Sequence, residues 1–161
     1  MKTIVCTLLS LLFTISINAQ DFATRFREEC KSNTLQCVTI GPKMMEAAVA
    51  NAGHAGENTE EINHIMSQLT SMQIISASRN GKLYYAKAQA LLKRNENRFE
   101  LYRILSEKSK KSQINIRKQE GKIVELVLLT LTQKEFKLIN FTGDMDTSSM
   151  QSLSRIMTKH S

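Results

Sequence analysis

The residues that could support chemistry fall into two short clusters, of which the first is rich in histidine and glutamate. It contains His54, Glu57, Glu60, Glu61 and His64. Glu60 and His64 are one helical turn apart and could share a metal ion. A metal site needs a third ligand, and the sequence does not mark one. We therefore interpret the cluster as a loop histidine followed by an exposed helix face, and we expect no metal and no cofactor.

The second cluster, Asp144-Met145-Asp146-Thr147-Ser148, begins like a calcium-binding loop. Such a loop requires glycine at its sixth position and glutamate at its twelfth. Ser149 and Arg155 stand at these positions. The segment fits a helix start instead, with Asp146 or Thr147 accepting a hydrogen bond from the first turn.

Glu125 is the one carboxylate within a long apolar stretch, Ile123 to Leu131. A buried carboxylate is costly unless it is paired. The predicted strand register places Lys118 diagonally opposite, so we expect Lys118 to supply the positive charge. We interpret Glu125 as a structural buried acid, whose truncation would cost about 1–3 kcal/mol. We predict no catalytic residue, since no serine lies in a GxSxG motif and no phosphate-binding glycine loop is present.

The N-terminus has the features of a cleavable signal peptide. Lys2 precedes an apolar stretch from Ile4 to Ile17, and Ala19 provides the small residue before the cut. We predict a signal peptide over 1–19 and a single domain over 20–161. The protein would then be exported to the periplasm or cell envelope of a Gram-negative bacterium, with no integral membrane segment after cleavage.

Cys30 and Cys37 remain after removal of this leader. An oxidising compartment permits a disulfide between them, and two separate half-buried thiols fit equally well. Their spacing excludes a redox CxxC motif.

The chain is moderately basic. Removal of Lys2 from the 22 Lys and Arg leaves 21 against 15 acidic residues, a formal charge of about +6. A basic stretch consists of Lys108, Lys110, Lys111, Arg117, Lys118 and Lys122. It has no interleaved aromatic residues, so nucleic acid is not an expected partner. We interpret the stretch as a solvated hairpin edge, with an anionic envelope surface as the alternative.

The periodicity predicts an α+β fold with a mostly antiparallel sheet. Helices are expected over 21–32, from Pro42 to about Ala52, from Thr59 onward, over 83–94 and after Asp146. Short strands are expected over 35–40 and 72–76. A four-strand meander follows, over 99–105, 113–118, 123–132 and 136–141, with two-residue turns at Glu120-Gly121 and Gln133-Lys134.

These turns predict which side chains share a face of the sheet, by pairing Ile116 with Glu125 and Leu129 with Leu138. The first predicted face carries Ile114, Ile116, Ile123, Val127, Leu129, Leu131, Phe136 and Leu138. The second carries Val124, Leu126, Leu128, Ile139 and Phe141. Both are apolar, so the second face is either covered by helices or binds a partner.

Several segments together resemble a known family. They are Phe22 and Phe26, the turn Gly41-Pro42-Lys43-Met44-Met45, the strand Gly121 to Leu129, and Phe136 to Asp146. The pattern is similar to a family of small exported Bacteroidetes proteins known as domain of unknown function 4252. The resemblance implies an envelope location and an α+β fold, and it implies no activity.

These observations favour a non-catalytic protein-interaction module of the cell envelope, in envelope stress or signalling. Its expected partner is an envelope protein or a second copy. A small periplasmic hydrolase and a binder of lipid or another apolar ligand are the alternatives; the eight methionines would suit the latter.

Overall fold

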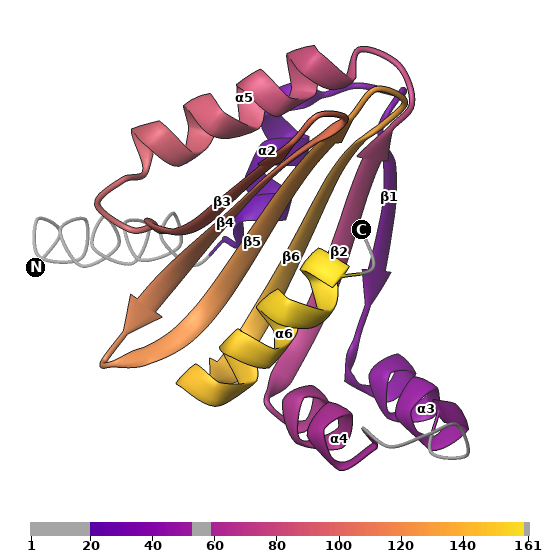
Figure 1. The fold of residues 1–161 in the computed structure, drawn as a ribbon, viewed down its shortest axis with the longest axis vertical. Helices are drawn as coiled ribbons and strands as arrows, with labels where there is room; N and C mark the ends of the chain where they lie inside the picture. The colour runs from indigo at the N-terminus through magenta and orange to yellow at the C-terminus, as the bar shows by residue number, and fades with distance from the viewer. Residues whose placement is uncertain (1–19, 53–58, 160–161) are drawn as a thin grey trace, which may run out of the picture.

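The computed structural model describes residues 20–52 and 59–159. It has the predicted α+β fold, a six-stranded antiparallel sheet with helices on both faces (Figure 1). The helices are α2 (Phe22–Cys30), α3 (Pro42–Ala52), α4 (Thr59–Ser67), α5 (Gly81–Arg94) and α6 (Thr147–Lys159). The strands are β1 (Gln36–Ile40), β2 (Leu69–Ala77), β3 (Glu100–Glu107), β4 (Lys110–Gln119), β5 (Lys122–Thr132) and β6 (Phe136–Met145).

The predicted signal peptide lies outside the described residues, as do His54 and Glu57. Among the helices of the described ranges, none is both long and apolar enough to cross a membrane.

The strand order is β1-β2-β6-β5-β4-β3, so β1 and β3 form the two edges of the sheet. Strands β3 to β6 form the predicted meander, and β2 pairs with the outer side of β6. Glu120 and Gly121 connect β4 to β5 with φ angles of 52° and 81°. Two left-handed residues in succession make the tight turn whose twist matches that of a hairpin. The turn between β3 and β4 is shorter than expected, because Glu107 already pairs with Lys110.

Helices α2 and α5 cover one face of the sheet, which we call the α2/α5 face. Phe22 and Phe26 of α2 are 1% exposed, and they pack against aromatic rings of β6 and of the segment before β3. Tyr84, Ala88 and Leu91 line the buried side of α5 at helical spacing. The sheet contributes Ile75, Ala77, Val127, Leu129, Phe136 and Leu138 to this layer.

Helices α3, α4 and α6 cover the opposite face, which we call the α6 face. Met45 of α3, Ile65 of α4, and Met150 and Leu153 of α6 supply its helical side. The sheet contributes Leu69, Ile114, Ile116, Ile123, Leu126, Leu128, Phe141 and Met145.

The residues predicted as a partner-binding face therefore lie under helices. Leu126, Leu128 and Phe141 are 0%, 2% and 5% exposed, while Val124 and Ile139 are half-buried. Of the two alternatives that the sequence leaves open, the structure has the helix-covered one. Leu126, Leu128 and Phe141 belong to the hydrophobic core of the α6 face and Ile139 packs against it, so these four residues do not form an open binding face.

The predicted composition of the two faces was wrong for Ile114, Ile116 and Ile123, which belong to the α6 face. Ile116 pairs with Leu126, and Arg117, instead of Ile116, pairs with Glu125. The turn starts the hairpin in the predicted register, with Lys118 opposite Ile123. Val124 is then an extra residue in β5, since the next pair is Arg117 with Glu125. Such a bulge shifts the pairing of β4 with β5 by one residue from the predicted register. The β4 side chains that lie farther from the turn than the bulge, including Ile116 and Ile114, therefore lie on the opposite face from the one predicted.

The next hairpin has no irregularity at its turn, and its predicted pairing of Leu129 with Leu138 is confirmed.

Further along β6, the backbone of Gly143 passes very close to the end of α4. A Cβ atom there would lie 2.1 Å from the carbonyl oxygen of Gln68, so only glycine fits.

Candidate functional site

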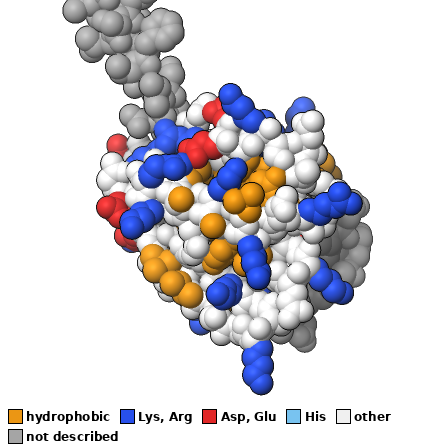
Figure 2. Space-filling view, turned by 90° about the horizontal axis from the view of Figure 1, so that it is seen from above, with side chains coloured by type: hydrophobic (Ala, Val, Ile, Leu, Met, Phe, Trp, Pro, Cys, Tyr) orange, Lys and Arg blue, Asp and Glu red, His pale blue; other side chains and the backbone are white. Residues whose placement is uncertain are grey.

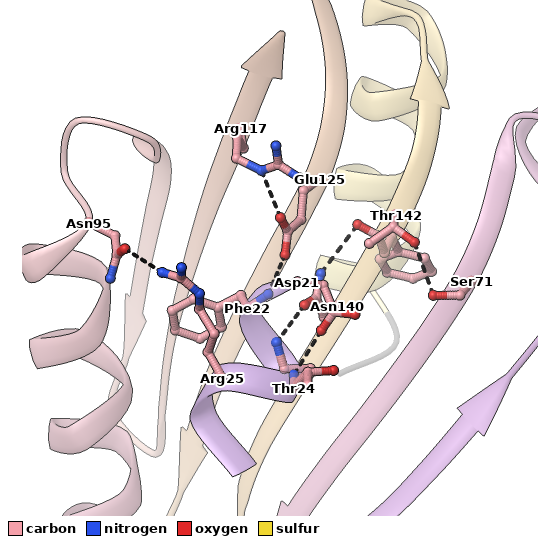
Figure 3. A network of polar contacts seen from close by, with 12 residues as sticks. Asp21, Phe22, Thr24, Arg25, Ser71, Asn95, Arg117, Glu125, Asn140 and Thr142 are labelled. Atoms are coloured by element: carbon pink, nitrogen blue, oxygen red, sulfur yellow. Dashed lines mark hydrogen bonds and ion pairs between the residues drawn. The ribbon is translucent and has the colours of Figure 1, made fainter. Parts of the chain in front are cut away.

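Glu125 is the most buried charged side chain among the described residues, at 0% exposed. It projects from β5 toward α2 (Figure 3). Its Oε1 atom accepts a hydrogen bond from the backbone N–H of Phe22 at 2.6 Å. Its Oε2 atom accepts one from Nε of Arg117 at 2.8 Å. The guanidinium and the positive end of α2 both compensate the buried charge.

Two further side chains complete the attachment of α2 to the sheet. Asn140 Oδ1 accepts a hydrogen bond from the backbone N–H of Ala23 at 2.7 Å. Asp21 Oδ1 accepts one from the backbone N–H of Thr24, also at 2.7 Å. Gln73 Nε2 donates to Asp21 Oδ2 at 2.7 Å. The first N–H groups of a helix have no partner within the helix. In α2, side-chain oxygens accept hydrogen bonds from the first three backbone N–H groups, those of Phe22, Ala23 and Thr24. We call the side chains that make or support these contacts the α2 clamp: Asp21, Gln73, Arg117, Glu125 and Asn140.

The clamp differs from the sequence prediction in its cation. Lys118 was predicted to pair with Glu125, but it pairs with Glu100 at the surface, with 2.6 Å between Nζ and Oε1. The extra residue in β5 brings Arg117 opposite Glu125 instead. Sequence reasoning also missed Asn140, although an amide between the apolar residues Ile139 and Phe141 of a strand signals a buried polar contact.

The second polar group joins the end of α4 to the start of α6. Asp146 Oδ1 accepts from the backbone N–H of Ser149 at 2.7 Å and so caps α6 as predicted. Its Oδ2 atom accepts from Gln68 Nε2 at 2.7 Å and lies 3.1 Å from Nε2 of His64. These donors, above all the Ser149 N–H, hold the pKa of Asp146 well below its usual range.

The two hydroxyl groups near this histidine–carboxylate pair make hydrogen bonds other than those of a catalytic triad. A histidine–carboxylate pair activates a nucleophile that lies beside the other ring nitrogen. The nearby Ser67 hydroxyl instead donates to the carbonyl oxygen of His64, and the Ser148 hydroxyl donates to Asp146. In 20–52 and 59–159, no three His, Cys, Asp or Glu side chains are grouped closely enough to hold a metal ion.

Cys30 and Cys37 are free thiols in the structure. Cys30 is half-buried, and burial raises the pKa of its thiol. A raised pKa lowers the thiolate fraction at neutral pH and makes this cysteine a weak nucleophile. Cys37 is exposed on the edge strand β1.

Exposed apolar side chains gather at the other edge of the sheet. Leu101, Tyr102 and Ile104 of β3 are 53%, 38% and 61% exposed, and we call these three the β3 edge. The main helix contacts with the sheet fall on β2, β5 and β6, so β3 extends beyond the helical cover. A register shift at Tyr102 brings Leu101 opposite Asn115 and Ile104 opposite Gln113, so both project on the α2/α5 side.

A family model for a domain of unknown function, DUF4252, matches residues 29–153. The chain belongs to this family. No curated protein matches its sequence. The matched segment of the DUF4252 domain contains all six strands and the helices α3, α4 and α5.

The α2 clamp crosses the boundary of the DUF4252 match. Arg117, Glu125 and Asn140 lie inside it, whereas the backbone amides of Phe22 and Ala23 that they hold come before residue 29. The clamp thus attaches a helix that lies almost wholly before the matched segment to the sheet within it. The β3 edge lies entirely within the match.

Proposed function

We propose that this DUF4252 protein is an exported component of the Gram-negative cell envelope that acts by binding protein, without chemistry of its own. The leader over 1–19 supports export. The observation that supports binding is the β3 edge. Three of the six large hydrophobic side chains that are exposed in the described residues lie on this one strand, Leu101, Tyr102 and Ile104. An open edge strand offers unpaired backbone groups to which a partner strand can add.

A second copy of the chain is the partner that this edge fits best. Two antiparallel β3 strands related by a twofold axis can place Leu101 of each opposite Ile104 of the other. Both side chains project on the α2/α5 side, so the pairing makes two apolar cross-strand contacts. It also places Tyr102 opposite Arg103 twice, which suits a cation over an aromatic ring. The product is one continuous sheet through both copies.

Sedimentation equilibrium over a concentration series tests this proposal. Leu101→Lys should convert a wild-type dimer to a monomer, because it sets a desolvated charge against Ile104 of the second copy. Val38→Lys is the matched control, since Val38 is 52% exposed and Leu101 53% exposed, on opposite edge strands. It should leave the molar mass unchanged, and both variants should keep the wild-type circular dichroism. A wild-type monomer at all concentrations, or equal dissociation in both variants, contradicts pairing through β3.

One observation favours binding of a small apolar ligand as a second function. A hollow of about 340 Å³ lies between α3 and α4, lined by Pro42, Met45, Glu46, Asn63, Met66, Ser67 and Leu69. Its size is at the lower end for ligand pockets, and methionine adapts to apolar ligands of varied shape. Saturable binding of a fluorescent fatty acid that Met66→Glu abolishes would support this function. Unsaturable binding, equal in wild type and variant, would contradict it.

A further inference from the structure

The charged side chains are separated along the direction of the strands. A row of paired residues crosses the sheet from Gln36 through Ser76, Lys137, Thr130 and Ser112 to Leu105. From this row outward lie the turns β3–β4 and β5–β6, the segment between α2 and β1, the segment between β2 and α5, and the first turn of α5. We call this part of the molecule the basic end. It contains eight basic residues, Lys31, Arg79, Lys82, Lys108, Lys110, Lys111, Lys134 and Lys137, and two acidic ones, Glu107 and Glu135.

The opposite end has the reverse balance. It comprises α3, α4, the first residue of β3, the turn between β4 and β5, the end of β6 and α6 as far as Arg155. Its acidic residues are Glu46, Glu60, Glu61, Glu100, Glu120, Asp144 and Asp146, and its basic ones are Lys43, Lys118, Lys122 and Arg155. The protein is therefore an electrostatic dipole, and the basic end holds most of the positive excess of the chain. Figure 2 views the molecule from the basic end and shows Lys and Arg side chains spread across this surface, with few acidic ones.

The cations of the basic end are available to a ligand. Arg79, Lys82, Lys108, Lys111 and Lys134 are exposed, and in the part of the chain that the structure describes they form no ion pair. Lys110 and Lys134 line one open hollow beside Glu107, and the other basic residues of this end are distributed over separate segments. Leu83, 53% exposed, adjoins Lys82 in the first turn of α5 and adds an apolar contact at the same surface.

We propose that the basic end binds the anionic surface of a membrane. Dispersed lysines match many separate phosphate headgroups better than a single small anion, which needs convergent donors. The dipole turns this end toward a negative surface before contact, and Leu83 then reaches the interfacial layer. The inference rests on the proposed envelope location, which brings the protein close to a membrane. It is independent of pairing through β3.

Vesicle co-sedimentation tests the inference with protein purified after export from a Gram-negative host. Phosphatidylcholine vesicles with and without phosphatidylglycerol are the two probes. Each lysine near an anionic surface contributes about 1 kcal/mol, or about fivefold in partitioning. The triple variant Lys82→Gln, Lys108→Gln, Lys134→Gln should therefore bind phosphatidylglycerol vesicles about 100-fold more weakly than wild type. Raised salt should abolish the wild-type binding, and neutral vesicles should bind nothing.

The control variant Lys43→Gln, Lys118→Gln, Lys122→Gln removes the same net charge from the opposite end. It should keep wild-type partitioning to within a few-fold, because these lysines face away from the membrane. Equal losses in the two triple variants, or no wild-type binding to anionic vesicles, overturn the inference. Competition by inorganic phosphate beyond that of sodium chloride at equal ionic strength also overturns it, since that result identifies a discrete anion site. The oligomeric state, measured without vesicles, separates this outcome from failure of pairing through β3.

Discussion

Loss of the Glu125 carboxylate should be among the most destabilising single changes in this protein. The side chain is 0% exposed and accepts from both Arg117 and the Phe22 amide. Removing one partner of a buried ion pair costs about 3–5 kcal/mol. The Arg117 side chain is 19% exposed and regains some hydration once it is unpaired, which favours the lower end of this range. An unsatisfied Phe22 N–H adds about 1–3 kcal/mol. We therefore expect Glu125→Ala to lower the free energy of unfolding by about 4 kcal/mol.

Urea denaturation at neutral pH measures this loss, and three further variants define its origin. Glu125→Gln keeps an acceptor for one of the two donors, so it should cost about half as much as Glu125→Ala. Arg117→Gln should cost about 3 kcal/mol, because it leaves the buried carboxylate without its cation. Lys118→Gln removes only an exposed pair with Glu100, whose side chains are 49% and 55% exposed, and should cost about 0.5 kcal/mol or less.

A larger destabilisation by Lys118→Gln than by Arg117→Gln would refute the Arg117–Glu125 pair, since the carboxylate would then have Lys118 as its partner. A change in the unfolding free energy of less than about 1 kcal/mol for Glu125→Ala would refute the buried hydrogen bonds, because this is the lower limit for a buried donor left unsatisfied.

Two further predictions follow from local geometry, and a third follows from the N-terminal sequence. Asp146→Ala should cost about 1 kcal/mol by removing the cap of α6. Because the folded-state pKa of Asp146 is lowered, this stabilisation is fully present above the pKa of an unfolded aspartate, about 3.9, and is lost progressively as the pH falls from there toward the folded-state pKa. The unfolding free energies of wild type and variant, measured by urea titration, should therefore differ at neutral pH and approach each other only well below about pH 3.9. Gly143→Ala should destabilise by about 1–3 kcal/mol in thermal or urea unfolding, because its Cβ would overlap the Gln68 carbonyl, whereas Gly121→Asn at the exposed turn should be tolerated. Intact-mass measurement of the exported protein should give a chain that begins at or within about two residues of Gln20, and a mass that retains the leader would contradict the predicted cleavage.

The sequence alone predicted which elements form. Apolar residues at helical spacing mark α4 and α5, and the change to strand composition after residue 98 marks the meander. Glu120-Gly121 marked a two-residue turn, and the structure has both residues at positive φ. The cap at Asp146 was predicted because the segment fits a helix start better than a calcium loop. These features depend on neighbours within a few residues, so local chemistry is sufficient to predict them.

The tertiary structure decided which surfaces meet. Val124 occupies a bulge that the neighbouring residues do not predict. Because of this one extra residue, Glu125 pairs with Arg117 and not with Lys118, the predicted partner. The sequence pattern around Leu126 and Leu128 is the same whether a helix or a partner protein covers them. These residues belong to the hydrophobic core because α6 packs over them. The open edge at β3 likewise follows from the strand order, which sets β3 at the end of the sheet. Burial, register and edges depend on contacts between residues far apart in the chain, and periodicity within a segment carries no information about them.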